Sequence, residues 1–339
     1  MIRLSDDRMI RKCLTTRIIR SSAHLIIALV LTACSPTEQA FEAAGKEAPS
    51  IRDSEFHAAD AAVLSSRSWL PARRPKAVIV ALHGMNDYSH SFEGTGAFFK
   101  AHGIAVYAYD QRGFGRSPGV GIWGGEENLV RDLGQYVRAL KQFYPHTPVY
   151  ILGESMGGAV AITALSHKDF PQVRGVILSA PAVWGSETIP ALYRGTLWLA
   201  AHSLPSMLLT GRDLKIIASN NYPMLRALAA DPLVIKGTRV DAVYGVVHLM
   251  DSAYEKIPAL HTPTLLLYGA HDQVIPPHPI HSALERFTIP IQYAHYPQGY
   301  HMLLRDLQAK LVMRDILSWI EDPDEELPSG FGEVVSPSP

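Results

Sequence analysis

The stretch at residues 149–158, VYILGESMGG, most constrains the fold of this 339-residue chain. It is a Gly-x-Ser-x-Gly motif centred on Ser155, and it follows an apolar strand-like run and precedes a helix-forming run at 159–165. This strand–turn–helix context is typical of a nucleophile elbow, a tight turn that exposes the serine hydroxyl. Gly153 and Gly157 would leave room where the turn brings strand and helix together. The motif therefore predicts Ser155 as a nucleophile; an ordinary glycine-rich turn is the alternative interpretation.

Strand-like and helix-like segments alternate along most of the chain. Apolar strand-like runs lie at 77–82, 104–109, 149–152, 173–179, 264–268 and 291–296, and helical patterns lie near 91–101, 126–143, 156–167, 281–287 and 302–320. This alternation predicts an α/β fold with a mostly parallel sheet that helices cover on both faces.

Two intervals depart from the alternation. Residues 182–257 are rich in Leu, Ala, Trp and Tyr, and we expect a helical insertion there between two core strands. The core would then comprise residues 56–181 and 258–321. Residues 322–339 carry Asp, Glu, Pro, Gly and Ser, which predicts a disordered tail.

A nucleophilic serine needs a base and an acid that orients it, and on this fold the chain order is serine, acid, histidine. Asp272 follows the strand-like run 264–268 and is our candidate acid, whereas the competing Asp251 and Glu255 precede that run. His301 follows the last strand-like run and is our candidate base. His295 lies within that run, where we expect it to pack or to face solvent.

An oxyanion hole needs two N–H donors that are in place before the reaction. One should be the amide of Met156, which directly follows the nucleophile. The other should come from the loop after the first parallel strand, where we expect the amide of Met85, with His83 shaping the loop. A purely structural bend is the alternative for this loop.

Taken together, these motifs resemble the α/β-hydrolase superfamily. The residues that carry the likeness are His83-Gly84, the stretch DQRGFGRS at 110–117, the serine elbow, and the candidate acid and base. Within the superfamily they are similar to the monoacylglycerol lipase and lysophospholipase branch, over roughly residues 56–321. The resemblance implies a helical cap at 182–257 with an apolar acyl tunnel, and Asp231-Pro232-Leu233 looks like a cap feature of that branch.

The activity that this resemblance implies is hydrolysis of carboxylic esters through an acyl-enzyme, without a cofactor. Single-chain acyl esters such as monoacylglycerols or lysophospholipids are the expected substrates. An aminopeptidase or amidase of the same fold is the first alternative. It would need an acidic cap pocket, for which Glu187, Asp213, Asp241 and Asp251 are possible sources. A non-catalytic binding protein is the second alternative.

Other polar residues favour structural interpretations. Arg112 and Arg116 are expected to brace the loop after the second strand rather than to bind phosphate. His271, His278 and His281 do not have the spacing of a common zinc site, so we expect no metal. The formal net charge of −1 gives no basic field for nucleic acid. The sequence carries no signal for the oligomeric state.

The N-terminal segment has the pattern of an export signal. Arg17 and Arg20 precede an apolar run at 25–31, which is too short to span a bilayer. The run ends in Leu-Thr-Ala-Cys at Cys34, which resembles a bacterial lipoprotein box. In that family the chain is cut before the cysteine, which then carries lipid. A buried N-terminal helix or an uncleaved membrane anchor is the alternative.

The lipoprotein resemblance implies a signal peptide at 1–33, a lipidated Cys34 and a flexible tether at 34–55. It also implies a protein of the bacterial cell envelope that is lipid-anchored on the periplasmic or outer face. The chain from residue 34 would have 25 basic and 30 acidic residues. Cys34 would be its only cysteine, so no disulfide could form within it.

Overall fold

A ten-stranded sheet forms the centre of the computed structural model, which describes residues 35–40, 48–184, 190–211 and 215–337. The strand order is β1 (Ser50–Arg52), β2 (Glu55–His57), β3 (Val63–Trp69), β5 (Ile104–Tyr109), β4 (Ala77–Leu82), β6 (Val149–Glu154), β7 (Gly175–Ser179), β10 (Thr264–Gly269), β11 (Ile291–Tyr296) and β12 (Gly332–Val335). The strands from β5 to β11 in this order pair in parallel, and the strands outside them pair antiparallel. The predicted α/β-hydrolase fold, with a mostly parallel sheet, is confirmed.

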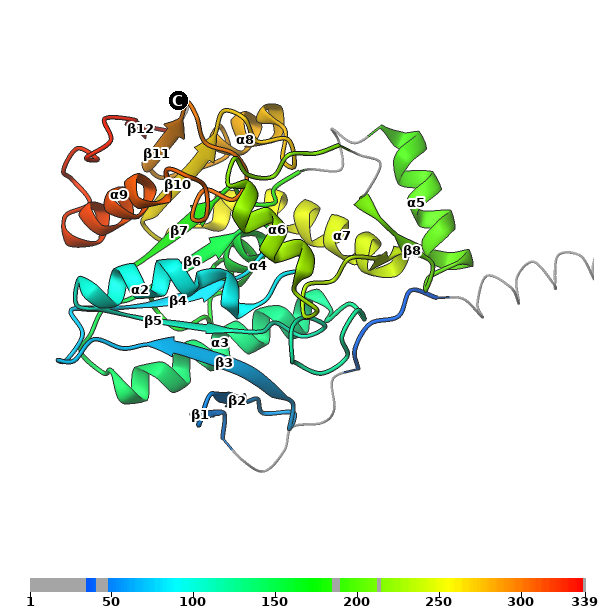
Figure 1. Ribbon diagram of the computed structural model, residues 1–339, viewed down its shortest axis with the longest axis horizontal. Helices are drawn as coiled ribbons and strands as arrows, with labels where there is room; N and C mark the ends of the chain where they lie inside the picture. The colour runs from blue at the N-terminus through cyan, green and yellow to red at the C-terminus, as the bar shows by residue number, and fades with distance from the viewer. Residues whose placement is uncertain (1–34, 41–47, 185–189, 212–214, 338–339) are drawn as a thin grey trace, which may run out of the picture.

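Helices cover both faces of the sheet (Figure 1). Residues of α3 (Glu126–Phe143), α4 (Met156–Leu165), α7 (Val240–Lys256) and α8 (Pro277–Leu284) share one core cluster. Residues of α2 (Glu93–Ala101) and α9 (Ala309–Glu321) belong to the other. Strand β4 contributes to both, because alternate side chains point to opposite faces: Val78, Val80 and Leu82 join the first cluster, and Ala77, Ile79 and Ala81 the second.

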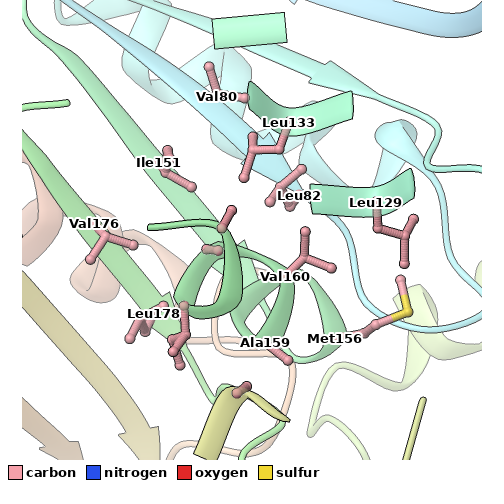
Figure 2. Close-up of a cluster of buried hydrophobic side chains, with 14 of the residues drawn as sticks. Val80, Leu82, Leu129, Leu133, Ile151, Met156, Ala159, Val160, Val176 and Leu178 are labelled. Carbon is pink, nitrogen blue, oxygen red and sulfur yellow. The ribbon is translucent and has the colours of Figure 1, made fainter. Parts of the chain in front are cut away.

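Figure 2 shows the core beneath the serine elbow. Leu129 and Leu133 from α3, Met156 and Val160 from α4 and Leu82 of β4 belong to one buried cluster, and all five are at most 1% exposed. A fully buried side chain of this size contributes about 1.5–3 kcal/mol relative to an exposed one. The helix that follows Ser155 is therefore held rigidly against the sheet.

The interval 182–257 contains α5 (Ala191–Ser203), α6 (Tyr222–Ala230), α7 and a short hairpin of β8 (Leu208–Leu209) with β9 (Thr238–Arg239). α7 packs on α4 and so belongs to the layer that covers the sheet. α5 lies far out from the sheet (Figure 1), and its Leu192 and Tyr193 are 75% and 67% exposed. Within the described ranges, 3₁₀ helices form at Ser89–Phe92 and Ile257–Ala259. None of the described helices is long and apolar enough to cross a bilayer.

The C-terminal segment differs from the predicted disordered tail. β12 pairs antiparallel with β11 along Ile291–Ala294 and closes that edge of the sheet. The backbone partners in β11 lie about 40 residues away in the sequence. The segment Gly332–Val335 therefore forms a strand despite a composition that is typical of disorder, because the edge of β11 is available for pairing.

The predicted flexible tether at 34–55 is also wrong for the part that the structure describes. The Gln39 amide N–H bonds the Trp123 carbonyl at 2.9 Å. The Gln39 side chain donates to the carbonyls of Pro118 and Ile122 at 3.1 and 3.2 Å. The Thr37 amide donates to Asp241 Oδ2 at 3.2 Å, at the start of α7. Residues 35–40 therefore dock on the domain, and β1 and β2 extend its sheet.

Two helices near the C-terminus begin at other residues than the sequence predicted. α8 begins at Pro277, a residue well suited to a first helical position. α9 begins at Ala309 rather than at 302, because Asp306 accepts a hydrogen bond from the Tyr300 amide at 2.7 Å and holds this stretch in turns.

Candidate active site

Ser155 lies at the junction of β6 and α4 with φ 53° and ψ −116°, a conformation that non-glycine residues rarely adopt. Its amide donates to the Ser179 carbonyl of β7 at 3.0 Å, which fixes the turn to the neighbouring strand. A Cβ at position 157 would collide with the Leu82 carbonyl, and one at position 153 would lie 2.6 Å from the Gly157 carbonyl oxygen. The predicted need for glycine at both positions is confirmed.

The candidate acid and base are paired. His301 Nδ1 and Asp272 Oδ2 lie 2.8 Å apart, in side chains that are 6% and 0% exposed. The other carboxylate oxygen of Asp272 accepts hydrogen bonds from the amides of Val274 and Ile275 at 2.8 and 2.9 Å. These bonds stabilise the ionised carboxylate and orient it toward the ring.

The competing residues lie elsewhere. His295 is on β11 and is exposed. It therefore faces solvent, which was one of the two positions expected for it. Asp251 and Glu255 belong to α7, whereas His301 pairs with Asp272. The position of Asp272 and His301 directly after parallel strands therefore correctly predicted that the fold brings them together.

The nucleophile and the base candidates share one edge of the sheet. Ser155 follows β6, Asp272 follows β10 and His301 follows β11, and these parallel strands end at the same edge. Ser155 Oγ forms no hydrogen bond with the His301 ring within the described part of the chain. Catalytic hydrogen bonds often tighten only when substrate binds.

The two candidate oxyanion donors flank the serine. A Cβ on Gly84 would lie 3.3 Å from Ser155 Cβ, so the loop that contains Met85 packs directly against the nucleophile. Met156 is the first residue of α4. Neither the Met85 nor the Met156 amide donates a hydrogen bond to any described residue. Both N–H groups therefore stay candidates for binding a developing oxyanion.

His83 holds the oxyanion loop in one conformation. The Gln111 amide donates to His83 Nε2 at 2.9 Å, so Nδ1 carries the proton and donates to the Gly84 carbonyl at 2.8 Å. The Gln111 side chain also donates to the His83 carbonyl at 2.8 Å. Burial lowers the pKa of His83 and keeps the ring neutral. The expectation that His83 shapes the loop is confirmed, while the partner Gln111 was not identified from the sequence.

A cavity of about 520 Å³ lies between this loop and the cap. Its lining includes Met85 of the oxyanion loop and Met302, the residue after His301. Apolar cap residues complete it: Leu209, Leu225, Leu228, Ala229, Val234 and Ile235. The cap is tied to the loop, because Asn86 Nδ2 donates to Thr238 Oγ1 at 2.7 Å. Such a volume and lining are typical of a small-molecule site.

Both charged residues that line this cavity have their charges engaged. Lys236 Nζ donates to the carbonyls of Leu228, Asp231 and Val234 at 2.7–3.0 Å. Asp87 accepts from Arg305 Nη1 at 2.7 Å. Among the described lining residues, no carboxylate is left to bind a substrate ammonium group.

Of the acidic residues that the aminopeptidase alternative requires, the two that the structure describes, Asp241 and Asp251, do not line this cavity. Asp241 pairs with Arg239 at 2.6 Å, and Asp251 lines a separate groove between α5 and α7. Glu187 and Asp213 lie outside the described residues, as does the candidate lipidation site Cys34.

Arg112, in the loop after β5, has the bracing role that was expected of it. Its buried guanidinium pairs with Asp60 and Asp132, both at 2.6 Å. The Arg116 amide donates to Asp110 Oδ2 at 2.8 Å within the same loop. Across the described ranges, no group of three or more His, Cys, Asp or Glu residues could hold a metal ion.

Comparison with protein families places this geometry among known proteins. A family model described as "Serine aminopeptidase, S33" matches residues 73–308, an interval that includes the serine elbow, the paired acid and base, and the cap.

Individual relatives agree with the family match. The chain is 27% identical over 261 residues to a monoacylglycerol lipase of Mycolicibacterium smegmatis, covering 74% of this chain and 90% of that protein. It is 28% identical over 275 residues to the human monoglyceride lipase, covering 77% and 88%. A solved soluble variant of monoglyceride lipase from Saccharomyces cerevisiae, in complex with a substrate analog, superposes with a TM-score of 0.68 at 18% identity, covering 86% and 100%.

Proposed function

Because this chain belongs to the serine aminopeptidase, S33 family and is an α/β-hydrolase of the monoacylglycerol lipase branch, we propose that it hydrolyses monoacylglycerols at Ser155. The enzyme class is carboxylic ester hydrolase. The observation that carries the substrate proposal is the mostly apolar cavity whose lining includes Met85, in the loop that packs against Ser155, and Met302, the residue after His301.

The proposed reaction is a two-step acyl transfer. His301 takes the proton of the Ser155 hydroxyl as Oγ attacks the ester carbonyl, and the amides of Met85 and Met156 stabilise the resulting oxyanion. Collapse of the intermediate breaks the C–O bond, and His301 returns the proton to the leaving glycerol. A water molecule then repeats the sequence on the acyl-enzyme and releases the fatty acid.

Asp272 supports this cycle by fixing the imidazole. Its carboxylate 2.8 Å from Nδ1 selects the tautomer that carries a proton there, which leaves Nε2 as the base. The same carboxylate stabilises the imidazolium that forms when Nε2 takes the serine proton. The buried surroundings strengthen that interaction relative to water.

The cavity supports an acyl chain rather than a peptide. Its apolar cap residues would remove an alkyl chain from water, and each buried methylene stabilises binding by about 0.8 kcal/mol. An aminopeptidase would instead need a carboxylate for the substrate ammonium group, and none is free in the described lining. The paired Asp272 and His301 beside an elbow serine also disfavour a non-catalytic binding protein.

Hydrolysis of 1-monooleoylglycerol, a lysophospholipid, an aryl ester and a peptide amide by the purified protein tests the proposal. We expect monoacylglycerol to be hydrolysed and the peptide to be left intact. Ser155→Ala and His301→Ala should each lose at least about 10³-fold in kcat, because such residues act as a unit. His295→Ala is the matched control and should stay near wild type. An inactive His295→Ala together with an active His301→Ala would contradict the assignment of the base.

Membrane attachment is a second proposal, and the sequence pattern at 17–34 supports it. We propose that Cys34 becomes the lipidated first residue and anchors the enzyme in the bacterial cell envelope, on the periplasmic or outer face. One acyl chain binds a membrane only marginally, whereas two or more hold firmly. We expect the wild type in the membrane fraction and Cys34→Ser without acylation. Mass spectrometry that finds an unmodified Cys34 in the mature protein would contradict this proposal.

A further inference from the structure

Three charged side chains beside the catalytic candidates form one ion-pair network. Arg305 Nη1 donates to Asp87 Oδ2 and Nη2 donates to Glu154 Oε1, both at 2.7 Å. The side chains of Arg305, Asp87 and Glu154 are only 11%, 7% and 3% exposed. Burial opposes the charge on Arg305, but the carboxylates of Glu154 and Asp87 outweigh it and raise the arginine pKa, so the cation persists.

The network connects the three loops that carry the proposed chemistry. Glu154 directly precedes the nucleophile at the end of β6. Asp87 lies two residues after Met85 in the oxyanion loop, and Arg305 lies four residues after His301. A single guanidinium therefore bridges the nucleophile, oxyanion and base loops, which are otherwise far apart in the chain.

The arginine is itself held in place by its main chain. Asn221 Nδ2 donates to the Arg305 carbonyl at 2.9 Å, and the neighbouring Asp306 accepts from the Tyr300 amide at 2.7 Å. The His301 loop is thus fixed on both sides of the base. A displacement of the guanidinium would be transmitted to the other two loops through the short hydrogen bonds.

Stabilisation of the fold does not by itself account for this network of buried charges. Arg305 Nε and Glu154 Oε2 are buried without a hydrogen-bond partner in the described chain. An unpaired buried polar atom costs about 1–3 kcal/mol, and a buried ion pair often stabilises no more than apolar side chains would. A planar guanidinium that is bonded to two carboxylates instead fixes the relative positions of the segments that carry them.

We propose that Arg305 is a positioning residue, which aligns Ser155, the Met85 amide and His301 through Glu154 and Asp87. The inference rests on the proposed function, because it takes these three as the reacting groups. Arg305 need not touch the substrate. Small misalignments of reacting groups can cost about 100-fold in rate, so the loss of the bridge should appear in kcat.

Kinetics of Arg305→Lys test this proposal on a soluble p-nitrophenyl ester. Lysine keeps the charge, but its ammonium does not match two carboxylates with a rigid fork. We expect kcat to fall about 10- to 100-fold, with KM within about three-fold of wild type. Glu154→Gln should lower kcat in the same direction, and its effect should not add to that of Arg305→Lys, since the two act through one contact.

Arg112→Lys is the matched control, because Arg112 is also buried against two carboxylates, Asp60 and Asp132. It should lower the melting temperature as Arg305→Lys does, while kcat per folded molecule stays near wild type. Equal kcat losses in the two variants, or an unchanged kcat in Arg305→Lys, would overturn the inference. If Arg305→Lys does not fold, a normal kcat in Glu154→Gln overturns it instead.

The rate at which a fluorophosphonate labels Ser155 separates this inference from the proposed function. Labelling should be slower in Arg305→Lys than in Arg112→Lys. If the wild type is labelled but hydrolyses no monoacylglycerol, the substrate proposal is wrong. The labelling rates of the two variants then still test the role of Arg305. A wild type that is neither labelled nor active would reject both.

Discussion

At the scale of single residues, the site depends on side chains that hold the reacting groups rather than react. His83 is the clearest case, because its neutral ring bridges the Gln111 amide and the Gly84 carbonyl. Burial disfavours the charged ring and lowers its pKa below the ordinary value of 6.5. Protonation of Nε2 would remove the acceptor for Gln111 and disturb the oxyanion loop.

This residue predicts a pH dependence of stability. Because the folded-state pKa of His83 is depressed, its contribution is present above the unfolded pKa of 6.5 and is lost as the pH falls below it. The free energy of unfolding should therefore fall between pH 7 and pH 5. We expect His83→Asn to show a correspondingly smaller drop in the free energy of unfolding, measured in urea at both pH values. Equal drops in the two proteins would show that the ring does not stay neutral.

At the scale of elements, the elbow depends on close contact between α4 and β4. Gly157→Ala would bring a Cβ into the Leu82 carbonyl, and the backbone of a central strand cannot move away. We expect a loss of about 2–3 kcal/mol, which is typical of overpacking, together with a displaced Ser155 and reduced turnover. Thermal unfolding and kcat measure the two effects.

Gly94→Ala in α2 is the control for that substitution, because nothing lies within 4 Å of the added Cβ. It should be neutral or stabilise by up to about 1 kcal/mol, since alanine favours a helix over glycine. If both variants lose similar stability, close packing at position 157 is not the reason for its glycine.

At the scale of the whole molecule, the cap and the core together enclose the cavity. We expect a preference for medium or long acyl chains over acetyl, because apolar cap residues such as Leu225 and Leu228 line it. The six methylenes that octanoyl adds to acetyl could in principle contribute several kcal/mol, although ordering of the chain offsets much of this. A series of p-nitrophenyl esters below their micelle concentrations should show kcat/KM rising about ten- to 100-fold from acetyl to octanoyl. A steady fall toward decanoyl would point to a short-chain esterase or a peptidase.

The sequence by itself determined the α/β-hydrolase fold, the elbow at Ser155 and the candidates Asp272 and His301. These features depend on local patterns: the strand–turn–helix context at 149–165, apolar strand-like runs, and polar residues directly after strands. Parallel strands end at one edge of a sheet, so position along the chain predicted which side chains would meet.

Only the tertiary structure decided the features that depend on distant partners. Gln39 docks on a loop about 80 residues away, and β12 becomes a strand because the edge of β11 is open to it. Arg305 meets Glu154 across 151 positions of the chain. Glu154 at the end of an apolar strand does signal a need for a buried partner. The sequence around it cannot specify which cation supplies the charge, because that choice depends on how the loops of β4, β6 and β11 come together in space.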